Sequence, residues 1–436
     1  MSSTTARDVN NILQHKFSVA PMMEYTDTHM RRLHRMISAE SVLYTEMITT
    51  NTLVRCDEPA RYLEADFPAE EPLVLQLGGN EPETMKKASE ISVKYGYREI
   101  NINAGCPSEK VSGAGCFGAA LMLQPDLLSE LALSVGEVLG KPATVKCRIG
   151  VNNDDSYEGL VRFIDHVNRK GKVEHFIVHA RKAVLGAKFS PADNRKIPPL
   201  KYDYVHNLVK DFPQLKFTIN GGINSLQEAQ DQLNQGVHGV MVGRACVNSP
   251  FHWRHTDTML YGSAQDPNFN RREILTQYAL YAGQQEAKHG RKLRSVLIKP
   301  VLQLFAGEPN GRLFRNQIDS LLRRVDLSIA DVMLEASKCL WDNVLDLRAS
   351  DPMVSYLTNG RVWTESSSEE ASQGDSRSRS SSPSSDSSSD SSTNSSNDRS
   401  NDSSNSIVSS SNIVSSSNIV SSNNSSSTAG AAAVSQ

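Results

Sequence analysis

Residues 99–122, EININAGCPSEKVSGAGCFGAALM, contain a strand-turn-helix pattern, and the fold prediction starts from this pattern. A short β-branched run breaks at a Gly-Cys-Pro turn, and a glycine-rich loop then leads into a helix-like apolar segment. A lone cysteine is usually a small buried hydrophobe. Cys106, however, follows a strand directly on an irregular turn, and the glycines after it permit close approach of the backbone to a ligand. We therefore predict a functional cysteine at the end of a strand.

Apolar runs of this kind recur along the chain, and most gaps between them contain a helical pattern. Eight strands that alternate with helices indicate a parallel (β/α)8 TIM barrel. A doubly wound open sheet is the alternative, but it needs a glycine-rich turn after its first strand, where this chain has Ala-Pro-Met-Met. The predicted strands are 17–22, 42–47, 73–77, 100–103, 143–146, 176–179, 217–220 and 239–242.

Several helix starts are visible in the sequence. The motif Asn-Glu-Pro-Glu at 80–83 predicts a capped helix that runs to about residue 95, and residues 155–169 have apolar residues at helical spacing. Ser225, with Glu228 three residues later, predicts a capped helix over 225–235. After residue 270 the pattern changes to helices without strands, and a small helical bundle is expected. Its predicted helices are 271–289, 293–305, 312–325 and 328–345.

The composition divides the chain into four predicted segments. These are an N-terminal extension at 1–16, a catalytic barrel at 17–265, a helical domain at 270–345 and a Ser/Asn-rich tail at 364–436. The tail cannot bury a core and is expected to be disordered. It carries 3 Lys+Arg and 8 Asp+Glu, so residues 1–363 carry 43 and 41. Near neutrality argues against a general polyanion coat but leaves room for a local basic face.

The six cysteines are scattered, without CxxC pairs or zinc-type spacing. This pattern predicts neither a disulfide framework nor a metal site. No apolar run approaches the roughly 18 residues of a membrane span, and residues 1–16 lack a signal-peptide core. We expect a cytoplasmic protein without membrane contact, with an organelle as the alternative.

Polar and charged residues stand at the ends of the predicted strands. In TIM barrels the active site lies at the carboxyl ends of the strands. Taken singly, each residue has an ordinary structural explanation, but their recurrence at one end of successive strands predicts a single polar pocket. Its members are Glu46, Gln76, Asn101, Asn103, Lys146, Arg148, His179, Arg181, Asn220 and Arg244.

Two glycine motifs predict a phosphate site. Asn220-Gly221-Gly222 follows the seventh predicted strand and Gly243-Arg244 the eighth. They combine backbone N–H groups, a helix start and a guanidinium where barrels commonly bind phosphate, so a phosphorylated cofactor is expected. Residues 181–201 are rich in Lys and Arg, with Asp193 as the acid among them. Such a loop suits a large anionic substrate, and a solvated surface loop is the alternative.

A set of motifs resembles those of a known family. They are FSVAPMMEYTD, LYTEMITT, VLQLGG, EININAGCPS, VKCRIG, IVHARKAVL with SPADNRKIPPL, INGGI and GVMVGRA. Together they resemble the tRNA-dihydrouridine synthases, and the HARKA and IPPL segments most resemble the branch that modifies uridines 20 and 20a of the tRNA D-loop. The resemblance implies an FMN-binding barrel, NADPH or NADH as electron donor, and a C-terminal helical domain that helps to dock tRNA.

The resemblance also implies roles for individual residues. Cys106 is implied as the catalytic acid. Flavin contacts are implied for Ala20, Pro21, Met22, Met23, Gln76, Lys146, His179, Asn220, Gly221, Gly222, Gly243 and Arg244. Positions expected near the flipped uridine or its phosphates are matched by Asn103, Arg181, Lys182, Asn194 and Arg195.

The chemistry of uracil agrees with these roles. Its C5–C6 double bond is conjugated to the C4 carbonyl, so hydride from reduced flavin N5 adds at C6 and leaves an enolate that needs a proton at C5. A thiol, with a reference pKa of about 8.5, still carries its proton near pH 7. Cys106 is therefore predicted as an acid rather than a nucleophile. Lys146 would stabilise the reduced anionic flavin, and His179 would contact its phosphate or ring.

The predicted function is reduction of D-loop uridine in tRNA to 5,6-dihydrouridine, with NADPH regenerating reduced FMN. The target base must leave its stack to reach the flavin. A flavin barrel that reduces a free pyrimidine or small enone is the first alternative. An RNA-binding scaffold without enzymatic activity is the second.

Overall fold

The computed structural model describes residues 15–67, 69–112, 117–186, 189–267 and 269–348, with two short strands at 355–356 and 362–363. Residues 1–14 of the predicted extension, the glycine loop at 113–116 and the predicted disordered tail lie outside the described residues.

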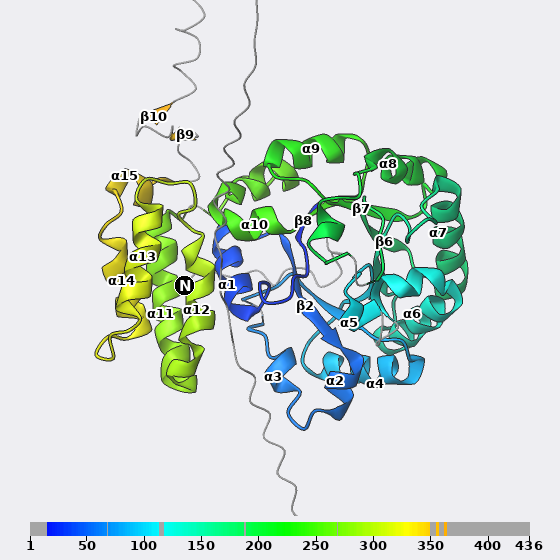
Figure 1. Cartoon of the computed structure of the whole chain (residues 1–436), viewed down its shortest axis with the longest axis horizontal. Coiled ribbons are helices and arrows are strands. Elements are labelled where there is room, and N and C mark those ends of the chain that lie inside the picture. Colours follow the sequence, from blue (N-terminus) through cyan, green and yellow to red (C-terminus); the bar gives the residue numbers. More distant parts are fainter. Residues whose placement is uncertain are drawn as a thin grey trace, which may run out of the picture. The chain divides into compact units, whose positions relative to one another are not determined.

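The fold is built around a closed eight-stranded parallel barrel (Figure 1). Strands pair in chain order, and the first pairs with the last, Phe17 opposite Val240 and Val19 opposite Val242. This closure confirms the TIM barrel and excludes the open sheet. The strands are β1 Phe17–Val19, β2 Val42–Thr49, β3 Leu73–Gly78, β4 Ile100–Ala104, β5 Thr144–Arg148, β6 His175–His179, β7 Lys216–Asn220 and β8 Gly239–Val242.

Alternate residues of the strands build two layers of core. Leu43 and Leu73 belong to the large apolar cluster between the strands and the outer helices. A separate buried cluster comprises Ala20, Val42, Tyr44, Val74, Ile177 and Met241. Because strands of a parallel barrel are buried on both faces, they appear in the sequence as nearly continuous apolar runs.

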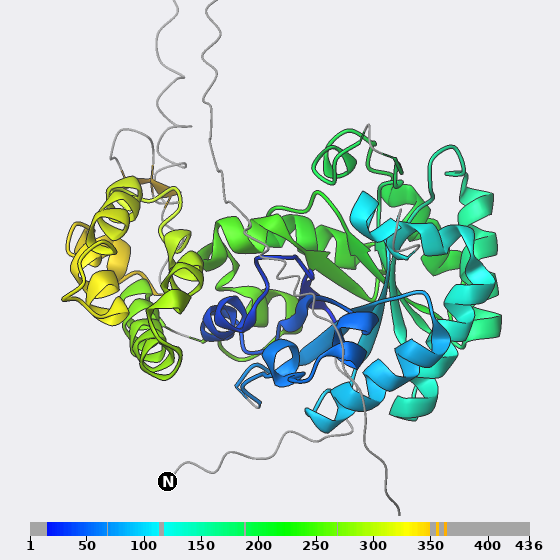
Figure 2. The ribbon, with the colours of Figure 1, turned by 60° about the horizontal axis from the view of Figure 1, so that its bottom comes forward.

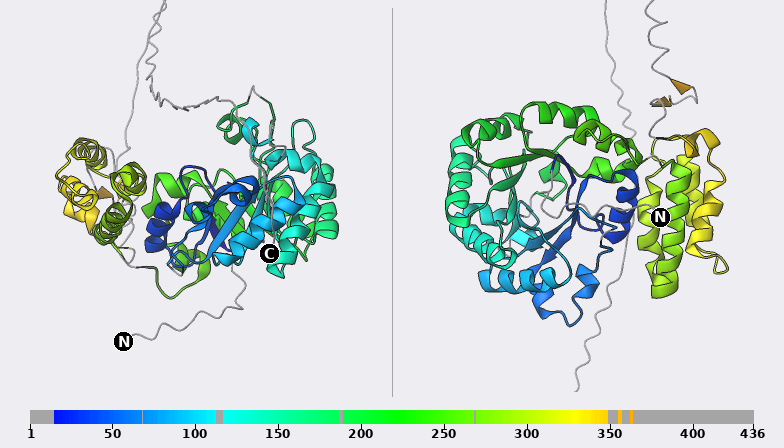
Figure 3. Two further views of the ribbon diagram at one scale, coloured as in Figure 1. Left: turned by 90° about the horizontal axis from the view of Figure 1, so that it is seen from below. Right: turned by 180° about the vertical axis from the view of Figure 1, so that it is seen from behind.

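Helices follow the strands and surround the barrel, as Figure 2 and Figure 3 show from other directions. The α-helices of this part are α1 Thr28–Ile37, α2 Thr50–Arg55, α3 Ala60–Leu63, α4 Pro82–Lys94, α5 Glu109–Ser112, α6 Pro125–Leu139, α7 Tyr157–Gly171, α8 Tyr202–Asp211, α9 Leu226–Asn234 and α10 Arg244–Asn248. Shorter turns are the 3-10 helices η1 Gly118–Leu123, η2 Asp193–Arg195 and η3 Pro250–Trp253 and the π-helix η4 Asp257–Tyr261.

Side-chain caps explain where several helices begin. The hydroxyl of Ser225 accepts the N–H of Glu228 at 3.1 Å, which confirms the cap predicted for α9. Ser156 caps α7, so this helix begins two residues later than predicted. The cap predicted for α4 is wrong in one respect: Glu81 makes no bond to a helix N–H, and its carboxylate accepts the Thr84 hydroxyl instead.

The C-terminal segment is helical, as predicted. Its first helix, α11 Arg271–His289, has the predicted bounds because Asn270 and Glu273 form a capping box. The others are η5 Arg291–Leu293, α12 Arg294–Leu302, α13 Gly311–Leu321, α14 Ile329–Ser337 and α15 Asp342–Leu345, followed by β9 Ser355–Tyr356 and β10 Val362–Trp363.

One predicted helix, residues 328–345, is wrong because the structure divides it into α14 and α15. The chain leaves the helical conformation at Trp341, which is extended at φ −75° and ψ 145°. The side-chain amide of Asn310 donates to the Cys339 carbonyl at 2.7 Å. This carbonyl therefore accepts a hydrogen bond from outside the helix. The apolar spacing continues through the break, so the sequence pattern alone does not reveal it.

Helix α1 joins the C-terminal helices to the barrel. Its residues Met30, Leu33 and Ile37 share one buried cluster with residues of α11 to α15. His29 Nδ1 lies 2.7 Å from the hydroxyl of Tyr281 on α11. The C-terminal helices therefore share part of their core with the first βα unit.

None of the helices in the described residues is both long and apolar enough to cross a membrane.

Candidate active site

Three amide side chains connect the carboxyl ends of β3 and β4. Gln76 Nε2 donates to Asn101 Oδ1 at 2.8 Å, and Asn103 Nδ2 donates to Gln76 Oε1 at 2.9 Å. Asn101 donates onward to the hydroxyl of Thr144 on β5 at 2.9 Å. Gln76 and Asn101 are buried. This chain of hydrogen bonds orients the Asn103 amide, which lies beside the cysteine turn.

Asn103 fixes the turn that carries Cys106. Its Oδ1 accepts the backbone N–H groups of Gly105 at 3.1 Å and of Cys106 at 2.9 Å. Gly118 has φ +64°, and a Cβ there would lie 2.6 Å from the Cys106 carbonyl oxygen, so only glycine fits. Cys106 is partly exposed and stands just beyond β4, where the sequence predicts it.

Lys146 lies on β5, and its side chain reaches the end of β7. Its Nζ donates to Asn220 Oδ1 at 3.0 Å, while Asn220 Nδ2 donates to the Met241 carbonyl at 2.8 Å. Burial, and then the nearby Arg148 guanidinium, lowers the pKa of Lys146 to about 8. The Cys106 thiol lies within the electrostatic range of this ammonium. A cation therefore stands close to the candidate acid.

The ends of β7 and β8 form a glycine cradle, made of Gly221, Gly222 and Gly243. Gly221 has φ +116°, and a Cβ there would lie 2.6 Å from the ring of His179. A Cβ on Gly222 would lie 2.5 Å from Leu200, and one on Gly243 would lie 3.3 Å from the sulfur of Met22. The cradle joins the ends of β7 and β8, named in the predicted phosphate site, to His179 of β6 and to Met22 after β1, and phosphate binding there stays a prediction.

Positive groups surround the cradle. Arg244 is exposed at the start of α10. Burial, followed by the charges of Arg148, Lys146, Arg181 and Arg244, lowers the pKa of His179 well below its usual value. His179 is therefore neutral near pH 7 and offers one N–H donor and one acceptor.

Arg148 connects two loops at this end of the barrel. Its Nε donates to the Gly105 carbonyl at 2.9 Å, and its Nη1 donates to the carbonyls of Lys182 at 2.9 Å and Asn194 at 3.0 Å. The guanidinium is buried. The cysteine turn is thus tied to the loop that follows β6.

The structure places Asn194 differently from the exposed position expected of a tRNA contact. Its side chain is fully buried and bonds twice with the backbone of Val184, accepting the N–H at 2.7 Å and donating to the carbonyl at 2.9 Å. The amide closes the loop on itself. A direct role of Asn194 toward tRNA stays a prediction, and the geometry gives it a role in shaping the loop.

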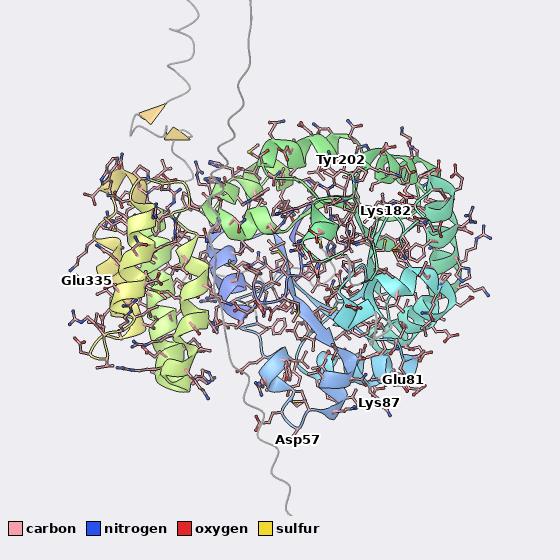
Figure 4. The ribbon with its side chains drawn as sticks, viewed as in Figure 1. Asp57, Glu81, Lys87, Lys182, Tyr202 and Glu335 are labelled. Atoms are coloured by element: carbon pink, nitrogen blue, oxygen red, sulfur yellow. The ribbon has the colours of Figure 1, made fainter. Side chains whose placement is uncertain are left out.

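Lys182 also has a partner within the protein. Asp155 accepts it at 3.4 Å and accepts Lys201 at 3.3 Å. Asp155 lies outside residues 181–201, in the loop that follows β5. It therefore neutralises part of the positive charge predicted for the loop at 181–201. Figure 4 places Lys182 and Tyr202 over the side of the barrel that carries β6 and β7.

Arg181 and Arg195 remain close to the cradle. Arg181 donates to the Pro198 carbonyl, and its guanidinium lies within the electrostatic range of Arg244. Arg195 is exposed, and its neighbours in electrostatic range include Arg244, Cys106 and Tyr25. Arg181 and Arg195 therefore both interact with Arg244, and Arg195 interacts with the Cys106 thiol as well.

The Ala-Pro-Met-Met segment runs from the barrel core to solvent. Ala20 is buried, Pro21 and Met22 are half-buried, and Met23 is 57% exposed. Ala20 and Met22 lie next to Gly243 of the cradle, and the flavin contacts of Ala20, Pro21 and Met22 stay predictions. Met23 points outward, and its flavin contact stays a prediction.

Two residues of this region were not assigned a role by the sequence. Tyr202 donates from its hydroxyl to the Gly221 carbonyl at 2.5 Å and so braces the cradle. Asp155 neutralises two lysines. The sequence gives no signal for either, because each contact joins loops that follow different strands.

The chain matches the family model described as "Dihydrouridine synthase (Dus)" over residues 18–338. It belongs to the dihydrouridine synthase family. This match confirms the resemblance and the enzyme class predicted from the motifs. The matched span includes the barrel, the cysteine turn and most of the C-terminal helices.

Individual relatives have a more specific name. The chain is 42% identical to a tRNA-dihydrouridine(20/20a) synthase of Vibrio vulnificus over 307 residues, which cover 70% of this chain and 90% of that protein. It is 40% identical to the enzyme of the same name from Synechocystis over 323 residues, 74% of this chain and 94% of that protein. A relative of the same name from Escherichia coli is 39% identical over 332 residues, 75% and 96% of the two chains.

Proposed function

We propose that this dihydrouridine synthase reduces uridines 20 and 20a in the D-loop of tRNA, with FMN as the bound hydride carrier and NADPH as its reductant. The observation that carries the proposal is the electrostatic interaction of Cys106 with Lys146, whose ammonium bonds Asn220 next to the glycine cradle, in a chain about 40% identical to tRNA-dihydrouridine(20/20a) synthases. A cytoplasmic location stays a prediction.

The cradle fits the phosphate of a flavin nucleotide. Gly221 and Gly222 have no room for a Cβ, which would meet His179 and Leu200, so their backbones lie directly beside these side chains, and Arg244 follows Gly243. Backbone N–H groups with a guanidinium are a typical anion site. Gln76, Lys146 and Asn220 would hold the ring system, since their polar atoms lie at the carboxyl ends of β3, β5 and β7.

Lys146 would stabilise negative charge on the reduced cofactor. With a pKa of about 8, its ammonium is still mostly protonated at pH 7. Asn220 holds the ammonium in place by accepting one of its hydrogens at 3.0 Å. When bound, the reduced flavin supplies a hydride to C6 of the uracil.

Cys106 would supply the proton that completes the reaction. Hydride addition at C6 leaves an enolate over C5, C4 and O4. The S–H bond of Cys106 breaks as the C5–H bond forms, and the C4 carbonyl is restored. Asn103 fixes the backbone N–H of Cys106 and so holds the thiol at one place. Solvent must then return a proton to the thiolate before the next turnover.

The test is mass spectrometry of tRNA that lacks dihydrouridine, before and after incubation with the protein, FMN and NADPH. We expect a gain of two hydrogens on uridine 20 or 20a. Equal turnover on free uridine would instead favour the small-molecule reductase, which leaves the exposed Arg195 without a role. No gain despite bound flavin would contradict the proposed substrate.

Cys106→Ala tests the role of the acid in the same assay. Removal of a general acid typically lowers the rate by about 100-fold or more. We expect dihydrouridine formation to fall by at least this factor, while the amount of bound flavin and the oxidation of NADPH stay as in the parent. Cys56→Ala is the matched control, because Cys56 is another partly exposed cysteine, at the end of α2. Loss of flavin from the Cys106 variant would contradict the role.

A further inference from the structure

The turn between β1 and α1 presents two large apolar side chains to solvent. Met23 is 57% exposed and Tyr25 is 53% exposed. They flank Glu24, which has φ +67° although it is not glycine. A non-glycine residue in this region of the backbone is strained, and such strain is found where the surroundings impose it, often at binding sites.

Bonds from three directions hold this turn. The Thr26 hydroxyl accepts the Met22 N–H at 2.9 Å, and the N–H groups of Tyr25 and Thr26 donate to the Met22 carbonyl at 3.1 and 3.0 Å. The Glu46 carboxylate on β2 accepts the N–H of Glu24. Arg31 on α1 donates to the Thr26 carbonyl at 2.7 Å. The aromatic side chain therefore stands on a rigid support, and its exposure is not a result of a loose loop.

The turn adjoins the cationic end of the barrel. Tyr25 lies within the electrostatic range of the exposed Arg195, which has Cys106 and Arg244 as its other neighbours. Lys299 of α12 is exposed and interacts electrostatically with Asp27 and with Glu46, which accepts the N–H of Glu24 in the turn. The exposed aromatic ring thus belongs to a turn that has cationic groups of both the barrel and the C-terminal helices in its surroundings.

We propose that Tyr25 is a stacking residue for tRNA, on which a base next to the target uridine packs when that uridine leaves its stack. Aromatic rings next to cationic groups are the usual means of holding unstacked bases and their phosphates. A rigid ring loses little entropy on binding, and base flipping leaves a neighbouring base without its partner. The inference rests on the proposed function, since it names a contact of the same substrate.

The test measures tRNA affinity rather than turnover. We expect Tyr25→Ala to weaken binding of an unmodified tRNA transcript about 10-fold, within the range found when a stacking aromatic is removed. Tyr25→Phe and Tyr25→Trp keep a ring and should bind within about 2-fold of the parent. Leu133→Ala is the control, because Leu133 is also a large exposed apolar residue, 40% exposed on α6.

Salt dependence separates stacking from charge. The slope of log affinity against log salt reports phosphate contacts, so Tyr25→Ala should leave the slope unchanged, whereas Arg195→Ala should reduce it by about 1. Flavin content and the melting temperature verify that the turn is intact. Equal affinity of Tyr25→Ala and the parent would overturn the inference, and so would failure of Phe or Trp to restore binding. Absence of dihydrouridine with the unaltered protein would instead count against the proposed function.

Discussion

At Gly221, the backbone conformation and the packing both require glycine. Its φ is +116°, and a Cβ would lie 2.6 Å from the His179 ring, so alanine would both strain the turn and displace the histidine. We expect Gly221→Ala to bind flavin at least about 10-fold more weakly, as measured by flavin fluorescence on titration of the protein freed of cofactor.

Gly140 is the matched control for this prediction. It also has a positive φ, +67°, but no atom lies within 4 Å of a Cβ placed there. Gly140→Ala should therefore cost stability, by about 1 kcal/mol, without a change in flavin affinity. Similar flavin affinities of the two alanine variants would mean that the cradle does not hold the cofactor.

Some contacts of single residues cannot be predicted from the sequence, because they join distant parts of the chain. Cys106, Lys146 and Gly221 were found because each lies at or just after the end of a predicted strand. Arg148 was placed at a strand end, but its bonds to the Gly105, Lys182 and Asn194 carbonyls depend on loops far apart in the chain. The burial of Asn194 depends on the same folding of its loop.

Helix α1 couples stability to pH, because it carries two buried histidines. Burial is the largest cause that lowers the pKa of His29 and of His34 to about 4. In the unfolded chain each has a pKa near 6.5, so between about pH 4 and 6.5 the unfolded state binds more protons than the folded state. Stability from these residues is complete above the unfolded pKa and is lost as pH falls through this window.

His34→Gln removes one of the two groups. We expect the free energy of unfolding of the parent to fall between pH 6.5 and 5, and the slope to be shallower in the variant by up to about 1.4 kcal/mol per pH unit. Urea titrations at several pH values measure this slope, whatever the absolute stability of the variant. Parallel curves would show that His34 takes up a proton in the folded state.

The helices illustrate which elements local sequence can define. α11 was predicted with its observed bounds, since the capping box at Asn270 and the residues at its end are local signals. The break between α14 and α15 was missed, because it depends on the contact of Cys339 with Asn310, 29 residues away. Local signals fix a helix start better than they reveal an interruption imposed by a neighbour.

At the scale of the whole molecule, the position at which the tail is removed decides whether the folded part keeps all of its contacts. Leu347 is buried, and Arg348 pairs with Glu273 at 2.9 and 3.1 Å. A chain that ends after Leu345, where the sequence predicts the end of the helical domain, loses both contacts. We expect it to melt several degrees lower than a chain that ends after Trp363, which keeps every described residue.

The chain that ends after Trp363 should keep full dihydrouridine formation. Thermal melting and the tRNA mass assay, applied to both truncations and the full chain, check the prediction. Equal melting temperatures of the two truncations would show that Leu347 and Arg348 add nothing to the helical core. A large loss of activity after Trp363 would assign the Ser/Asn tail a role in catalysis.

The sequence by itself determined the barrel, the C-terminal helices and the family of this protein. Strands buried on both faces leave continuous apolar runs, and the glycine and cysteine turns follow those runs directly, so both signals are local. Tertiary structure decided how the loops meet. It joined Cys106 to the β6 loop through Arg148, neutralised Lys182 with Asp155, buried Asn194 and brought Tyr25 into electrostatic interaction with Arg195. These contacts join residues that only closure of the barrel brings together, and no local periodicity encodes them.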